Sequence, residues 1–328
     1  MPLQLLLLIL GLALIILGGD LFVSAAVRIA ELLRMPRVVI GSTLVSLATT
    51  SPELVVSITA GAKGESGLAV GNALGSCVCN IGLILGLTAA LKHIDVHPPA
   101  LRVPLVAMLL FGLLLMVMTT DLVLSRWQGV SLVVLGAGYF IYDFVRHSRD
   151  TRPADIAEAT AIEREVKARF AWLKTKWGTA IQFLFGAGIV VFGSRLLVDA
   201  AVNIAGTLGI PSMVIGLTVV AVGTSLPELI TAVTSSRRNV SDIAVGNIVG
   251  ANIANLSLVV GTAAALHEVD MDRATQLLNF PALLVSMVLL LYVLLTENRV
   301  TRRQGVLLLV FYAVYLAAVV GLAVFRRG

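Results

Sequence analysis

The chain contains two copies of one long segment, and each copy carries a proline–glutamate pair. Residues 18–86 align with residues 193–261 without a gap, at a constant offset of 175 residues. Within this alignment ATTSPE matches GTSLPE, so that Glu53 corresponds to Glu228. A duplicated chain is expected to fold into two similar halves related by a pseudo-twofold axis. The fold must therefore bring two copies of the same acidic element into equivalent places.

The composition is that of an integral membrane protein. Hydrophobic residues make up 58% of the chain and charged residues 13%, whereas soluble domains average about 25% charged residues. At about 20 residues per helix, the apolar stretches predict an all-α membrane protein with ten transmembrane helices. The predicted spans are 3–23, 38–61, 67–91, 103–121, 127–145, 178–203, 211–235, 241–266, 277–296 and 303–324. The first is interpreted as a helix rather than a signal peptide, because no basic segment precedes Leu3.

Each half is predicted to hold five helices, which is an odd number, so the second half would enter the membrane from the opposite side. We therefore predict two inverted five-helix repeats, residues 1–145 and 178–328. The charged segment 146–177 between them is interpreted as a cytoplasmic linker. Most of the 24 Lys and Arg residues would then lie on the linker's side of the membrane. The positive-inside rule places both termini outside the cytoplasm, in what we expect to be a bacterial inner membrane.

The two glutamates lie in predicted membrane spans. A carboxylate in hydrocarbon is unfavourable and by default marks an ion or substrate path. Pro52 and Pro227 precede Glu53 and Glu228, and a proline inside a helix frees a backbone carbonyl that can help to bind a cation. The alternative is a protonated, hydrogen-bonded structural carboxyl. Two such elements in corresponding positions are typical of a secondary transporter's binding site.

Oxygen-bearing side chains accompany both glutamates. A threonine or serine stands three and four residues before each glutamate, on the same helical face; these are Thr49, Thr50, Thr224 and Ser225. The next helices supply stripes at four-residue spacing, namely Asn72, Ser76 and Asn80, matched by Asn247, Ala251 and Asn255, with Asn252 beside them. An all-oxygen set suits hard cations such as Ca²⁺, Na⁺ or a proton, and not Zn²⁺ or copper.

The charges of this set favour exchange of one ion for another. Two carboxylates neutralise one divalent cation. Without it, they would repel each other in a low dielectric, so Na⁺ or H⁺ would have to take its place. A site that is unfavourable to leave empty is expected to reorient mainly when loaded.

The motifs ATTSPE and GTSLPE, with the paired AVGN segments at 69–72 and 244–247, resemble the alpha repeats of the cation/calcium exchanger superfamily. The bacterial and archaeal sodium/calcium exchanger branch is the most similar. The resemblance implies an antiporter, not an enzyme, that exchanges Ca²⁺ for Na⁺ by alternating access. Glu53 and Glu228 would be the central calcium ligands, and Thr49 and Thr224 would add oxygens there. The sodium or auxiliary positions would be lined by Thr50, Ser225, Ser76, Asn80 and Asn255.

The same resemblance implies which partners the chain has. They are Ca²⁺, Na⁺ or H⁺ as transported ions, and the lipid bilayer. No resident cofactor and no nucleic acid are expected, and an oligomer is not required. A Ca²⁺/H⁺ antiporter of the same fold, a passive cation channel and a membrane enzyme with acidic catalysis are the alternatives. Inverted repeats favour alternating access over a channel, and the sequence has no nucleophile–base constellation for an enzyme.

Three departures from the pattern of the superfamily involve four positions. Ala251 stands where many members carry a serine, which removes a hydroxyl from one lateral monovalent site. Thr50 replaces the usual serine, and Asn80 and Asn255 are amides where some relatives, including potassium-dependent ones, have an aspartate. These departures argue against potassium dependence and leave the number of Na⁺ ions, and the choice of Na⁺ or H⁺, open.

Other polar and small residues receive simpler interpretations. Cys77 and Cys79 are two apart on one helix, so an internal disulfide is not expected. The repeat-equivalent Asp20 and Arg195 have opposite charges and are expected near membrane ends, where snorkelling or pairing accommodates them. Glycines that we expect between closely packed helices are Gly71, Gly75, Gly246 and Gly250. The histidines His93, His97, His147 and His267 fall at predicted helix ends or in loops, which argues against a relay through buried imidazole.

Overall fold

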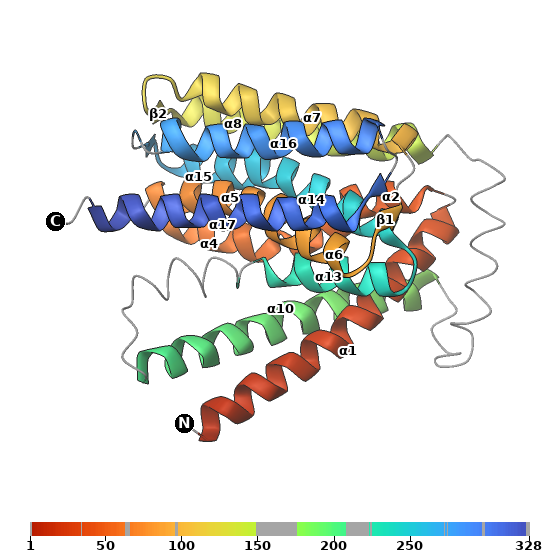
Figure 1. Cartoon of the computed structure of the whole chain (residues 1–328). Helices are drawn as coiled ribbons and strands as arrows, with labels where there is room; N and C mark the ends of the chain where they lie inside the picture. Colours follow the sequence, from red (N-terminus) through yellow and green to blue (C-terminus); the bar gives the residue numbers. More distant parts are fainter. Residues whose placement is uncertain are drawn as a thin grey trace.

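The computed structural model describes residues 2–33, 35–62, 66–95, 98–148, 176–207, 223, 225–271, 273, 275–296 and 299–325. Nearly all of these residues are helical, and the longer helices run side by side (Figure 1). The long helices are α1 (Pro2–Leu33), α7 (Pro98–Met118), α8 (Arg126–Ser148), α10 (Lys176–Thr207), α16 (Phe280–Thr296) and α17 (Arg302–Phe325). Helices α1 and α10 lie next to each other on one flank of the bundle, and α7, α8 and α16 lie on the opposite flank (Figure 1).

The remaining helical segments are joined end to end, with π-helical turns between several of them. One predicted span becomes α2 (Arg37–Ile40), π-helix η1 (Gly41–Val45), α3 (Ser46–Thr49) and α4 (Ser51–Ala62). The next becomes α5 (Ser66–Cys79), η2 (Asn80–Leu85) and α6 (Gly86–Leu91). In the second half the segments are α13 (Leu226–Arg237), α14 (Ser241–Ala254), η5 (Asn255–Val259), α15 (Val260–Leu266) and, before α16, η6 (Thr275–Asn279).

Eight helices in the described part of the chain are long and apolar enough to cross a membrane. The first of them is longer than predicted, because the helix continues to Leu33 instead of ending near residue 23. Of the predicted span 211–235, only Gly223 and the residues from Ser225 onwards are described. The protein is therefore a mostly helical, multi-pass membrane protein.

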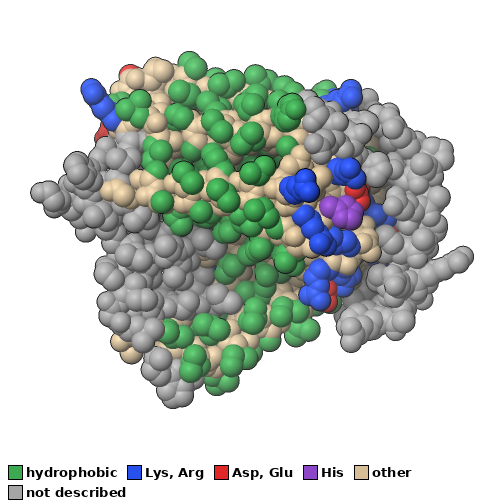
Figure 2. Space-filling view, in the orientation of Figure 1, with side chains coloured by type: hydrophobic (Ala, Val, Ile, Leu, Met, Phe, Trp, Pro, Cys, Tyr) green, Lys and Arg blue, Asp and Glu red, His purple; other side chains and the backbone are tan. Residues whose placement is uncertain are grey.

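The outer surface of the bundle is apolar, as lipid requires. Leu184 is 69% exposed, Val117 65% and Leu6 61%, and many other large hydrophobic side chains are similarly open. Figure 2 shows hydrophobic side chains over most of the described surface on this face, with Lys and Arg gathered towards one edge. A soluble monomer rarely exposes so large an apolar surface, whereas a bilayer covers it.

Short strands reveal how the two halves are related. Strand β1 (Ile94–Asp95) pairs antiparallel with β4 (Arg299–Val300), and β2 (Val123–Leu124) pairs with β3 (Val269–Asp270). Strand β3 is the repeat-equivalent of β1 at the offset of 175, and β4 corresponds closely to β2. Each small sheet thus joins the two halves, and one sheet is the symmetry mate of the other.

Contacts in the centre of the bundle obey the same symmetry. The amide of Asn252 donates to the backbone oxygen of Cys77 at 3.3 Å, and the Cys77 thiol lies 3.7 Å from the backbone oxygen of Asn252. These two residues are equivalent in the repeat, and a residue that meets its own symmetry mate lies close to the twofold axis. The pseudo-twofold axis therefore passes between α5 and α14. Cys77 and Cys79 form no disulfide with each other, as predicted.

Helix α14 is buried along nearly its whole length, from Ile243 to Ala254, and its glycines allow that burial. A Cβ at Gly246 would lie 2.2 Å from the backbone oxygen of Val38, and one at Gly250 would lie 2.2 Å from that of Ser42. A side chain at either position would push away α2 and η1, to which Val38 and Ser42 belong. Close packing is thus confirmed for these two glycines. For Gly71 and Gly75 no described atom lies within 4 Å of such a Cβ, and their repeat-equivalent partner segment, near residues 213–217, is outside the described residues.

Candidate cation site

The helix break beside Glu53 follows from Pro52. Proline has no N–H to donate to the backbone oxygen of Ala48, four residues earlier. The helix α3 ends at Thr49, α4 begins at Ser51, and the Ser51 hydroxyl donates to the free oxygen of Ala48 at 2.8 Å. In the second half α13 begins at Leu226, with Pro227 in its first turn. Each proline therefore places its glutamate in the first turn of a new helix.

The broken helix α3–α4 and the segment at the start of α13 exchange contacts at the glutamates. The hydroxyl of Thr50 donates to Oε1 of Glu228 at 3.3 Å. The hydroxyl of Ser225 lies 3.5 Å from Oε1 of Glu53, at the limit of a hydrogen bond. These contacts are repeat-equivalent, because Thr50 corresponds to Ser225 and Glu53 to Glu228. The hydroxyl of each half thus reaches the carboxylate of the other half, and the two acidic elements meet at the pseudo-twofold axis.

Neighbouring helices supply further polar groups to this place. The hydroxyls of Ser225 and Ser76 are 3.2 Å apart, which brings α5 to the start of α13. The hydroxyl of Thr49 donates to Oδ1 of Asn247 at 3.0 Å, which brings α14 to the broken helix α3–α4. An unpaired polar group is unfavourable inside the membrane. These contacts therefore also fix the position of each proline–glutamate segment against the neighbouring helix.

Two asparagines stand where α-helix changes to π-helix. Asn80 is the first residue of η2 and Asn255 the first residue of η5, and π-turns in helices are frequent at functional sites. The amide of Asn80 donates to Oδ1 of Asn252 at 3.0 Å. The oxygen of Asn80 and both amide atoms of Asn255 are buried without a hydrogen-bond partner among the described residues.

The predicted site residues are all buried where the structure describes them. Their exposures lie between 1% and 3% for Thr49, Thr50, Glu53, Ser76, Asn80, Ser225, Glu228 and Asn255. Thr224 lies outside the described residues. Hydrogen bonds connect Thr50 with Glu228, Ser225 with Ser76, Thr49 with Asn247 and Asn80 with Asn252.

The chemistry of this set fits a hard cation. Its described side chains are carboxylates, hydroxyls and amides. Several of their oxygens, Oε2 of Glu228 and Oδ1 of Asn80 and Asn255, are buried without a donor in the described part of the chain. Buried acceptors normally have a partner, and a cation is one that oxygen ligands prefer. No group of three or more His, Cys, Asp or Glu side chains that could hold a metal ion occurs among the described residues, so a cation here would depend on hydroxyl and amide oxygens beside the two carboxylates.

Sequence reasoning gave too little weight to Asn252 and overlooked Asp143. Asn252 bridges Asn80 and Cys77; its signal was its position one residue after the stripe of Ala251 and Asn255. Asp143, on α8, is fully buried, and its Oδ2 accepts a bond from Ser42 at 3.3 Å. An acidic residue inside a predicted span was a signal for it.

The expectation that no imidazole is buried is wrong for His147. This residue does lie in the last turn of α8, but it is only 8% exposed. Its Nδ1 lies 2.9 Å from the backbone oxygen of Asp143, one turn earlier on the same helix, and 3.4 Å from Oδ1 of that residue. The i,i+4 spacing of the two residues brings them together, and the cost of burying the carboxylate alone explains why the ring folds back onto it.

A profile of the sodium/calcium exchanger protein family matches residues 3–145 and 178–321, and so covers both halves. The chain belongs to the sodium/calcium exchanger family. It is 36% identical to the inner membrane protein YrbG of Escherichia coli over 315 residues, with 95% of each chain covered. It is 28% identical to the sodium/calcium exchanger MaX1 of Methanosarcina acetivorans over 338 residues, covering 95% of this chain and 97% of that one.

Solved structures agree with this membership. The sodium-calcium exchanger NCX_Mj superposes on the chain with a TM-score of 0.81 at 30% identity. The alignment covers 97% of this chain and 99% of NCX_Mj. The similarity of fold to this exchanger therefore extends over 97% of the chain, across both halves.

Proposed function

We propose that the protein is a secondary antiporter that exchanges Ca²⁺ for Na⁺, with the cation held between Glu53 and Glu228. The reciprocal contacts Thr50–Glu228 and Ser225–Glu53 carry this proposal. They bring two buried carboxylates to one place on the pseudo-twofold axis. Two carboxylates balance the charge of one Ca²⁺, and the hydroxyls and amides around them complete an oxygen shell.

The exchange step follows from the same charges. When Ca²⁺ leaves, two carboxylates at 1% exposure are left in a low dielectric, where their repulsion is strong. Na⁺ ions bound at each carboxylate would remove that charge, and so would protons. Because the unloaded site is unfavourable, the protein reorients mainly with ions bound, which couples the two fluxes.

The architecture of the proposal is ten transmembrane helices in two inverted five-helix repeats, 1–145 and 178–328. Alternating access would move one group of helices against the other around the fixed site. The linker at 146–177 would be cytoplasmic and both termini would lie outside, because most basic residues are in loops on the linker's side. The symmetry of the small sheets and of the central contacts supports the repeats.

A Ca²⁺/H⁺ antiporter is the second candidate, and Ala251 favours it. Ser76 has a hydroxyl 3.2 Å from that of Ser225, but its repeat-equivalent Ala251 has none. The position beside Glu228 is therefore poorer in oxygen for Na⁺, whereas a proton needs only the carboxylate.

The test is calcium uptake into liposomes containing the purified protein. Radioactive Ca²⁺ is supplied outside, with an outward gradient of Na⁺ in one set and of H⁺ in another. Uptake driven only by Na⁺ supports the leading proposal, and uptake driven only by H⁺ supports the second candidate. Calcium entry that needs neither gradient would indicate a passive channel. No entry under any condition would contradict calcium as the substrate.

A further inference from the structure

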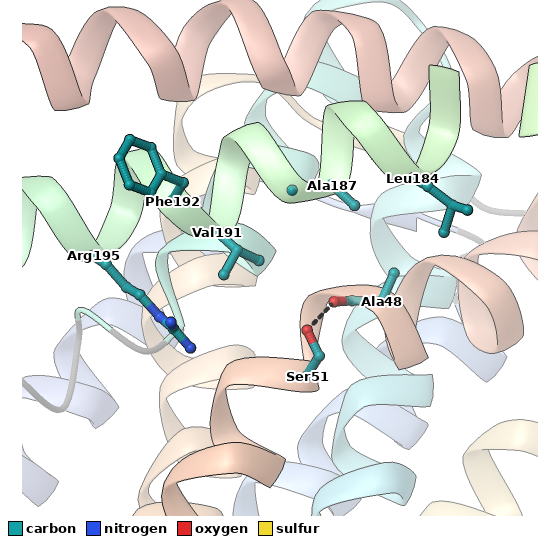
Figure 3. Close-up of a pocket in the computed structure, with 8 residues that line it drawn as sticks. Ala48, Ser51, Leu184, Ala187, Val191, Phe192 and Arg195 are labelled. Atoms are coloured by element: carbon teal, nitrogen blue, oxygen red, sulfur yellow. Dashed lines mark hydrogen bonds between the residues drawn. The ribbon is translucent and has the colours of Figure 1, made fainter. Parts of the chain in front are cut away.

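A cavity of about 440 Å³ separates α10 from the break in the first broken helix (Figure 3). On the α10 side it is lined by Leu184, Ala187, Gly188, Val191, Phe192 and Arg195. On the other side it is lined by Ala48 and Ser51, which flank the cation-site residues Thr49 and Thr50. The cavity thus connects the outside of the bundle with the back of the helix break.

The cavity is apolar along most of its length and faces lipid. The residues from α10 recur every three or four positions and form one stripe on that helix. From Leu184 to Arg195 the stripe is about 16 Å long at the rise of an α-helix. Leu184 is 69% exposed and Phe192 61%, so the stripe borders the surface that the bilayer covers.

Arg195 stands at the end of this stripe without a protein counter-ion. It is the last but one residue of the apolar span Trp177–Leu196, and it is exposed. Among the described residues no carboxylate pairs with it, and Asp199, one turn further on α10, does not form an ion pair with it either. A guanidinium at the edge of the hydrocarbon reaches the lipid interface by snorkelling, where it matches the geometry of a phosphate.

The equivalent position in the other half carries the opposite charge and has a partner within the protein. The repeat-equivalent of Arg195 is Asp20, on α1. Asp20 accepts bonds from the guanidinium of Arg238 at 3.0 and 3.2 Å, and Arg238 also bonds Ser24 at 2.7 Å. Where the position is acidic, the protein itself provides the opposite charge. Where it is basic, no described carboxylate pairs with it, and the guanidinium stays open to an anion from outside the protein.

We propose that this cavity is a binding site for a phospholipid with an anionic headgroup. Its phosphate accepts hydrogen bonds from the Arg195 guanidinium, and one acyl chain lies along the stripe from Phe192 to Leu184, against Ala48. The bound chain fills the space behind the helix break. It therefore supports the segment that carries Thr49 and Thr50 from the side opposite the cation.

The test uses photo-crosslinking in vesicles. The purified protein is reconstituted in phosphatidylcholine vesicles containing a small fraction of phosphatidylglycerol with a photoreactive diazirine in its acyl chain. After illumination, lipid adducts are mapped by mass spectrometry of peptides. We expect adducts on the α10 stripe and on the segment around Ala48 and Ser51. A phosphatidylcholine analogue with the same diazirine should label these peptides several-fold less.

Four variants decide between a specific site and ordinary contact with lipid. Gly188→Leu places a side chain in the cavity, and no described atom lies within 4 Å of a Cβ at Gly188, so the first atom of that side chain has room. Gly138→Leu on α8 is the matched control, because Gly138 is exposed and equally open. Arg195→Gln removes the charge and should weaken phosphatidylglycerol labelling about fivefold. Arg195→Lys keeps a cation and should retain most of the labelling.

The outcomes separate clearly. Loss of the mapped adducts in Gly188→Leu and Arg195→Gln, with normal labelling in Gly138→Leu, supports the site. Equal labelling by the two lipids, or labelling unchanged in Arg195→Gln, overturns it and leaves only non-specific lipid contact. Each variant is first checked for monodisperse elution. If Gly188→Leu does not fold, the comparison of Arg195→Gln with Arg195→Lys still decides, because a structural defect alone would not distinguish the two lipids.

Discussion

The two flanks of the cation site differ although they descend from the same repeat. Beside Glu53 stand two hydroxyls, those of Ser225 and Ser76, which are 3.2 Å apart. Beside Glu228 stands the hydroxyl of Thr50, and the position equivalent to Ser76 is Ala251. The backbone symmetry is thus close, while the oxygen content of the two flanks is unequal. A nearly symmetric scaffold can therefore carry two ion positions of different affinity.

The helix breaks show a second difference of the same kind. In the first half, Ser51 donates to the backbone oxygen that Pro52 leaves free (Figure 3). In the second half the equivalent residue is Leu226, whose side chain has no hydrogen-bond donor. The carbonyl freed by Pro227 is therefore not capped in this way. Each proline leaves one backbone oxygen without its helical donor. The residue just before the proline decides whether a side-chain hydroxyl donates to that oxygen.

The largest expected effect tests what the two flanks share. Glu53→Gln and Glu228→Gln should each lower calcium uptake in liposomes by about 100-fold or more, because a lone carboxylate cannot neutralise Ca²⁺ at a buried site. An equal loss in both variants would show that calcium transport requires both carboxylates equally, although the hydroxyls beside them differ. Full uptake by either folded variant would refute the proposed site.

The next effect separates the flanks. Ser225→Ala removes a hydroxyl that contacts both Glu53 and Ser76, whereas Thr50→Ala removes one that contacts Glu228 alone. A hydrogen bond to a charged group contributes about 1.5–3 kcal/mol, and one between neutral groups about 1 kcal/mol. We therefore expect Ser225→Ala to weaken the apparent affinity for the exchanged cation more than Thr50→Ala. The measurement is the cation dependence of uptake, and the reverse order would contradict the comparison.

A third prediction would make the flanks alike. Ala251→Ser restores the hydroxyl that the first half has in Ser76, and we expect the apparent affinity for Na⁺ to rise about fivefold, the equivalent of one hydrogen bond. The matched variant Ser76→Ala should lower it. Both are read from the Na⁺ dependence of calcium uptake. An unchanged Na⁺ dependence in Ala251→Ser would mean that the position does not face an ion.

The smallest effect concerns the capped break. Ser51→Ala leaves the backbone oxygen of Ala48 without its donor and should lower the free energy of unfolding by about 1 kcal/mol. Ser131→Ala is the control, since Ser131 donates to a backbone oxygen within the continuous helix α8. Thermal unfolding in detergent measures both. Equal midpoints for the two variants would show that the cap does not stabilise the break.

Much of the fold and of the site was predictable from the sequence because lipid imposes strong rules on it. A membrane span must be long and apolar, so the composition alone indicated a multi-pass helical protein. A duplicated proline–glutamate pair in such spans is hard to explain by packing, and it singled out Glu53 and Glu228 as candidate ligands. Their hydroxyl and amide neighbours followed from helical spacing, and the described ones are buried as expected.

Only the tertiary structure decided which groups meet. Thr50 bonds the glutamate of the other half, not Glu53 three residues away, and Asp20 finds its partner in Arg238, more than 200 residues distant. His147 lies at a helix end, yet it is buried on Asp143. Spacing along a helix predicts a shared face but not the segment that packs against it. The sequence alone therefore determined the elements and their charges, while the packing of the two halves determined the contacts.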